Sequence, residues 1–210
     1  MKRWQIIVLA VIVLLATAVA AGYHLGVRLL QGKIVAALGP GSRLNALKIN
    51  WFTIEIVGLS IDAPKGWPAA RTLEAERVAI VPDLRSLLND QIRISSIVVD
   101  KPYLSMLRTP GKLRIVPSLT EDEHKKSSPE QGDNRAVIIS TIEIRDGSLD
   151  IFDATVSRPA LKIRMDEIDA VIRNVAAPAA DKTQFELTGI VKGIRRDGRA
   201  KLSGWVGPGA

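Results

Sequence analysis

The residue types that most often do chemistry in proteins are sparse in this chain. It contains no cysteine, so thiolate zinc sites, iron–sulfur clusters, disulfides and cysteine nucleophiles are excluded. Its two histidines, His24 and His124, lie far apart in the sequence, which argues against a paired-histidine metal site and a Ser-His-Asp triad. It also lacks a Gly-x-Ser-x-Gly nucleophile elbow. We therefore expect no enzyme, no catalytic residue, no metal and no cofactor.

Two short motifs have both a chemical and a structural interpretation. Residues 121–124, Glu-Asp-Glu-His, offer metal ligands, but they lie in the polar, proline-containing segment 120–134, which is typical of a solvated loop. Residues 39–41, Gly-Pro-Gly, resemble a phosphate loop, but such loops lie between a strand and a following helix. Here a helical pattern precedes the motif. The sequence therefore favours a solvated loop and a helix end.

The N-terminus carries an unbroken apolar run over residues 6–22. With residues 23–27 extending it, a helix at ~1.5 Å per residue just spans a bilayer core of ~30 Å. A cleaved signal peptide is the alternative, since Ala18-Val19-Ala20 is an acceptable cleavage site. The run is longer than a usual signal-peptide core, so residues 1–23 are predicted to be a retained transmembrane anchor.

The charges around this run predict its orientation. Lys2 and Arg3 favour a cytoplasmic N-terminus, whereas Arg28 and Lys33 favour the opposite. We expect the N-terminus inside, with residues 24–210 outside the cytoplasm. Residues 24–39 then read as an amphipathic helix, whose apolar stripe either lies on the membrane or caps one end of the following domain.

From residue 44 onward the apolar pattern repeats every second residue. Alternating runs occupy 92–99, 138–145, 161–166, 168–173, 185–191 and 201–206. Turn signals at 109–112, 146–147 and 197–198 predict an antiparallel meander, with one helix over 82–89. The predicted organisation is a first β-unit over 40–119, a flexible charged linker over 120–135 and a second β-unit over 136–210.

The two β-units share an internal repeat. Residues 94–99 align with 139–144, and the alignment continues so that Leu104 falls on Leu149 and Met106 on Ile151. Two copies at a constant offset indicate a repeated strand–turn–strand unit.

The order of these features resembles the N-terminal part of AsmA-like envelope proteins, including relatives catalogued only as a domain of unknown function. The resemblance is carried by the membrane helix, the amphipathic helix ending at Leu38-Gly39, and five β segments. These segments are residues 57–61, 78–88, 92–102, 142–149 and 202–206. Typical family members are several times longer than this chain.

The resemblance implies a single-pass protein of the Gram-negative inner membrane with its bulk in the periplasm. It also implies a curled antiparallel sheet of β-groove type, like that of bridge-like lipid transfer proteins, and a link to phospholipid transport or outer-membrane assembly. About ten strands at ~4.8 Å spacing give a groove of only ~50 Å, too short to cross the periplasm alone.

The groove, if present, is expected to be lined by apolar residues of the repeated strands. The candidates are Ile94, Ile97, Ile142, Ile144, Leu149, Ile151, Leu161 and Ile163. Expected partners are membrane phospholipid and other envelope proteins, and not nucleic acid, although the chain carries a net charge of +7. Two alternatives stay open: the apolar face is a packed core, or the protein is an assembly scaffold that binds proteins and not lipid.

Overall fold

The computed structural model of the chain describes residues 38–39, 41–50, 52–83, 85–86, 91–117, 136–177 and 182–207. The division of the chain into compact units falls after Ala37, and every described strand belongs to the unit Leu38–Ala210. The strands are β1 (Ser42–Arg43), β2 (Ala46–Ile49), β3 (Ile54–Asp62), β4 (Arg71–Pro82), β5 (Gln91–Asp100), β6 (Tyr103–Thr109), β7 (Lys112–Ile115), β8 (Ala136–Asp153), β9 (Leu161–Ala177), β10 (Thr183–Val191) and β11 (Gly198–Val206). The prediction of a mainly β protein is confirmed.

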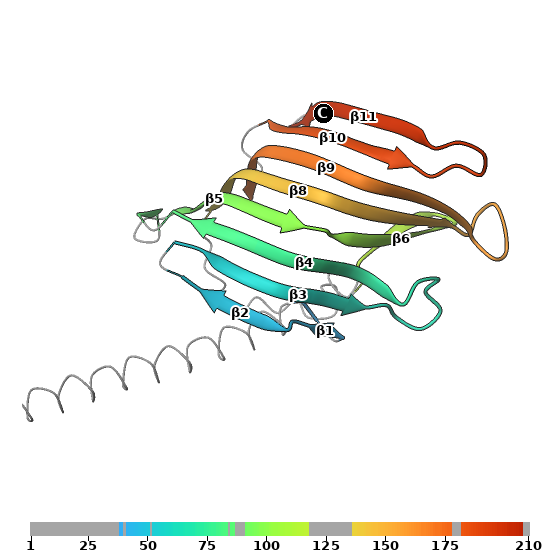
Figure 1. Cartoon of the computed structure of the whole chain (residues 1–210), viewed down its shortest axis with the longest axis horizontal. Coiled ribbons are helices and arrows are strands. Elements are labelled where there is room, and N and C mark those ends of the chain that lie inside the picture. The colour runs from blue at the N-terminus through green and yellow to red at the C-terminus, as the bar shows by residue number, and fades with distance from the viewer. Residues whose placement is uncertain are drawn as a thin grey trace, which may run out of the picture. The chain divides into compact units, whose positions relative to one another are not determined.

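All of these strands form one sheet (Figure 1). Its main path runs β1-β3-β4-β5-β8-β9-β10-β11, while β2 also pairs with β3, and β6 pairs with β4, β7 and β8. Most pairs are antiparallel, but β8 runs parallel to both β5 and β6. The predicted purely antiparallel sheet is therefore wrong, and the sheet is mixed. A parallel pair needs a long crossover, which the connection between Ile115 and Ala136 supplies.

The internal repeat of the sequence forms two neighbouring parallel strands. Ile94 lies opposite Ile139 in the β5–β8 pair, and Leu104 lies opposite Leu149 in the β6–β8 pair. The offset that aligns the two copies in sequence is thus also the register of their hydrogen-bonded pairing. Similar side chains lie side by side across the sheet as a result.

The turn predicted at Asp146-Gly147 is a β-bulge inside β8. The register of β8 with β9 shifts on both sides of Gly147, and Asp146 has a φ of 52°. Positive φ also occurs at Gly58 of β3, Lys101 between β5 and β6, and Glu167 of β9, with values of 65°, 47° and 52°. These residues lie at the same level along the strands as Asp146. The expected hairpin turn is therefore wrong, because the chain adds one extra residue and continues in the same direction.

The predicted turn at 109–112 is confirmed, since it joins β6 to β7. The hairpin predicted at Asp197-Gly198 also forms, but its loop spans residues 192–197 and Gly198 already pairs with Val191 in β11, so the two-residue turn is wrong. Of the predicted helix over 82–89, residues 84 and 87–89 lie outside the described residues, and Pro82 belongs to β4. The predicted anchor over 1–23, nearly all of the helix over 24–39 and the linker over 120–135 also lie outside them. Among the residues that the structure describes, no helix is long and apolar enough to cross a membrane.

A small hydrophobic core lies where the β3–β4 loop folds over one end of the sheet. Trp67, Leu107 and Phe152 are buried there, with Ala63, Ala69, Ala154 and Ala160 packed around them. The indole Nε1 of Trp67 donates a hydrogen bond to Ser105 Oγ at 2.8 Å, and Ser105 is itself fully buried. This cluster fixes the loop residues 63–70 on the sheet.

Candidate functional site

One face of the sheet carries apolar side chains across nearly its whole width. Residues opposite each other in register share a face, and alternate residues of a strand point to opposite faces. One register row consists of Leu47, Ile56, Val78, Val99, Ile144, Ala170, Leu187 and Leu202. The adjacent row consists of Ile49, Ile54, Ile80, Ile97, Ile142, Ile172, Phe185 and Gly204. We call this surface the apolar face.

The bulge in β8 keeps the apolar face continuous beyond these rows. A Cβ on Gly147 would lie 3.2 Å from Cγ2 of Ile144, so the two positions point to the same side. Leu149 and Ile151 follow Gly147 at alternate positions and pair with Met165 and Ile163 of β9. Without the extra residue in β8, these two side chains would point to the opposite face.

Seven of the eight predicted lining residues lie on the apolar face. They are Ile97, Ile142, Ile144, Leu149, Ile151, Leu161 and Ile163. Ile94 lies beyond an irregularity in the β4–β5 register, where Val81 pairs with Ser96 and Pro82 with Ile94, so alternation from Ile97 does not assign it to either face. Leu161 is 50% exposed and Ile163 40% exposed, and the other six are half-buried.

The apolar face is buried in part and open in part: Leu47 and Ile56 of the first row are each 7% exposed, whereas Leu202 of the same row is 58% exposed. All of the described strands belong to one sheet, so no second sheet of the described residues packs on this face, and no described helix crosses it. The rows cross eight strands, which corresponds to about 34 Å at ~4.8 Å per step. This width is less than the ~50 Å expected from about ten strands side by side. Fewer strands lie side by side, because β6 follows β5 along the same line and β7 lies off the main path.

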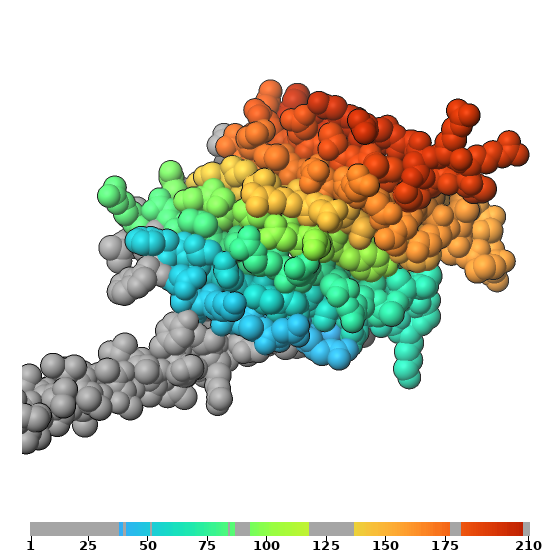
Figure 2. Space-filling view, viewed as in Figure 1, coloured from blue at the N-terminus to red at the C-terminus, as the bar shows by residue number. Residues whose placement is uncertain are grey.

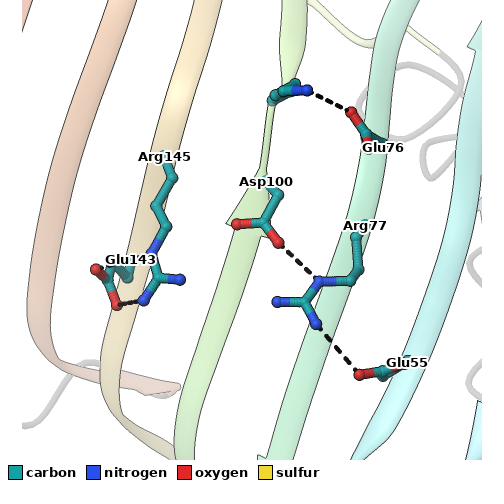
Figure 3. Close-up of polar contacts among 7 residues, drawn as sticks. Glu55, Glu76, Arg77, Asp100, Glu143 and Arg145 are labelled. Carbon is teal, nitrogen blue, oxygen red and sulfur yellow. Dashed lines mark hydrogen bonds and ion pairs between the residues drawn. The ribbon is translucent and has the colours of Figure 1, made fainter.

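The opposite face, which we call the polar face, carries ion pairs that connect neighbouring strands. Arg77 lies between Glu55 of β3 and Asp100 of β5, at 3.3 and 2.7 Å (Figure 3). The hydrogen bond that Arg77 donates to the Asp100 carboxylate raises the pKa of Arg77. Arg145 binds Glu143 two residues away in β8 and lowers the pKa of that carboxyl group. These charged side chains therefore form ion pairs with one another on the polar face.

Two open hollows lie on the polar face. One, of about 240 Å³, is lined by residues that include Glu143, Arg145, Glu186 and Thr188. The other, of about 270 Å³, includes Glu167, Asp169 and Arg199. Both are lined largely by charged and polar side chains, so they do not offer an enclosed apolar site. The only lining candidate that they touch is Ile144.

The sequence reasoning missed a buried carboxylate, Asp150, on β8. It is 3% exposed and accepts a hydrogen bond from the Tyr103 hydroxyl at 2.9 Å. Lys162 pairs with the same carboxylate at 2.9 Å. Burial, followed by the bond to Asp150, raises the pKa of Tyr103 to about 12. The internal repeat could have pointed to this position, since it places Asp150 opposite Ser105, which is also buried.

The described residues contain no group of three or more His, Cys, Asp or Glu that could hold a metal ion, and residues 121–124 lie outside them. The chain matches no protein-family model. No curated protein matches it either. The resemblance to AsmA-like proteins stays a prediction.

Proposed function

We propose that this protein binds lipid acyl chains on its apolar face and contributes to phospholipid transport or envelope assembly. The observation that carries the proposal is the pair of apolar register rows, which lie on a face that no second sheet or helix of the described residues covers. An acyl chain laid on such a surface leaves water, which favours binding by about 0.8 kcal/mol per buried CH₂. No reactive side chain is needed for this role.

The cellular setting is part of the same proposal. Anchored in the inner membrane by residues 1–23, with the sheet in the periplasm, the protein would act as an AsmA-like lipid carrier. The apolar rows span only about 34 Å, so the protein works with other envelope proteins if lipid is to cross the periplasm.

The test uses two neighbouring positions of one strand. Ile142 points to the apolar face and Glu143 to the polar face, because Ile142 pairs with Ile97 while Glu143 pairs with Val98. A photoreactive residue replaces each in turn in intact cells, and mass spectrometry identifies the adducts. Lipid adducts at position 142 and none at 143 are expected. Protein adducts or no adduct at 142 would contradict lipid binding there.

A scaffold role is the second candidate, and the free edge of β11 favours it. All nine residues of β11 pair with β10, and among the described strands nothing pairs with its other side. Leu202, Trp205 and Val206 are 58%, 55% and 60% exposed on this strand. An unpaired edge with exposed apolar side chains can accept a strand from another protein. Protein adducts from a photoreactive residue at position 203, without lipid adducts at 142, would favour this role.

A further inference from the structure

Four loops of the sheet lie at the same end. β3, β5–β6, β8 and β10 run in one direction, because β4 and β9 are antiparallel to their neighbours and β8 is parallel to β5 and β6. The loops that follow them, residues 63–70, 110–111, 154–160 and 192–197, therefore share one end of the sheet (Figure 1). In Figure 2, teal, orange and red side chains protrude there.

This end is basic. Its loops contain Lys65, Arg158, Lys192, Arg195 and Arg196, against the single carboxylate of Asp197. Asp197 pairs with Lys192. Within the described part of the chain, neither a carboxylate nor another hydrogen-bond acceptor binds Arg158, Arg195 or Arg196. The positive charge of these loops is thus available to an external anion.

Two exposed aliphatic side chains accompany the arginines. Val156 is 64% exposed in the β8–β9 hairpin tip, and Ile194 is fully exposed in the β10–β11 tip. The two hairpins lie two strand spacings, or about 10 Å, apart across the sheet. They are staggered along it, since Val191 at the end of β10 pairs with Met165, four residues after the start of β9. Cations beside protruding aliphatic groups suit the headgroup layer of an anionic membrane, where both are stabilised. A nucleic acid would attract the cations but would not bury the aliphatic side chains.

We infer that the two tips, residues 154–160 and 192–197, dock on an anionic phospholipid bilayer, with Val156 and Ile194 entering the headgroup layer. The inference rests on the proposed function, which it extends with a point of lipid entry. Leu161 and Ile163 begin β9 directly after the first tip and are the two most exposed lining candidates. A lipid leaving the bilayer at the tips meets the open part of the apolar face first.

The experiment uses the full chain, which has no native cysteine. Ile194→Cys carries an environment-sensitive fluorophore, and Ser203→Cys, an exposed position in the middle of β11, carries the same probe as a control. Each protein is reconstituted into vesicles of phosphatidylcholine alone or mixed with phosphatidylglycerol, with a quencher on the lipid. Arg195→Gln with Arg196→Gln removes two charges at the tip, and Arg173→Gln with Lys201→Gln removes two elsewhere.

Docking predicts lipid quenching at position 194 in the phosphatidylglycerol vesicles only, and little at 203. At ~1 kcal/mol for each basic residue, the tip double variant should lower the ratio of docked to undocked protein roughly thirtyfold, and the control double variant should not. Equal quenching in both vesicle types, or none at 194, would overturn docking. Probe protection by duplex DNA without quenching would overturn it in favour of nucleic acid. Lipid adducts at position 142 are compatible with each of these three results. The docking proposal can therefore fail while the proposed lipid binding stands.

Discussion

Ile97 and Ile142 are direct partners on two parallel strands, although the chain returns to this row only after a long connection. Their pairing joins the first β-unit to the second. It places Ile80, Ile97, Ile142 and Ile172 in one row across four strands. The continuity of the apolar face therefore depends on this parallel register.

A disulfide tests the register. Ile97→Cys with Ile142→Cys should form an intramolecular bond on mild oxidation, because opposite residues on one face bring their Cβ atoms within the reach of a disulfide. Ile97→Cys with Glu143→Cys should not, since those side chains lie on opposite faces. A shift in electrophoretic mobility without reductant measures both. Equal bonding in the two proteins would contradict the register.

Trp67 is predicted to carry much of the stability of the β3–β4 loop. Replacing it by Ala removes a buried aromatic side chain and its hydrogen bond to Ser105, and should cost about 3–5 kcal/mol in the free energy of unfolding. Trp205→Ala is the control, because Trp205 is 55% exposed and should cost much less. Urea unfolding followed by circular dichroism gives both values. Similar losses would show that the cluster around Trp67 is not a core.

Tyr103 predicts how stability responds to alkaline pH. Its pKa is raised to about 12 in the folded protein, against about 10 when exposed. Below pH 10 the hydroxyl is protonated in both the folded and the unfolded protein, so it does not make the free energy of unfolding depend on pH. Between pH 10 and 12 the unfolded chain ionises first, so stability falls. Tyr103→Phe should flatten this part of the thermal-midpoint profile from pH 9 to 12.5, and an unchanged profile would mean that the pKa of Tyr103 is not raised in the folded protein.

Gly58 is predicted to require glycine for two separate reasons. Its φ is 65°, and a Cβ there would lie 2.2 Å from the side-chain nitrogen of Asn45. Gly58→Ala should therefore cost more than the ~1–2 kcal/mol of the left-handed backbone alone. Gly111→Ala isolates that backbone cost, since Gly111 has a φ of 89° and open space around it. Asn45→Gly should recover part of the loss, measured again by urea unfolding.

Much of the sheet could be predicted from alternation alone. The runs at 92–99, 185–191 and 201–206 became β5, β10 and β11, because a strand with one wet and one apolar face imposes a two-residue period. The hairpin predicted at 197–198 also forms, although its loop spans 192–197. The same local logic failed at Asp146-Gly147, because this dipeptide is typical of a hairpin turn but also fits a bulge, and only pairing with β9 distinguishes the two.

The sequence by itself determined which segments are strands, which residues are apolar and that two segments repeat at a fixed offset. Tertiary structure decided that the repeats pair in parallel and that Leu149 shares a face with Ile144. These outcomes depend on register between distant strands and on one extra residue at a bulge. Both are set by cross-strand hydrogen bonds and packing, which the order of residues along a single strand does not encode.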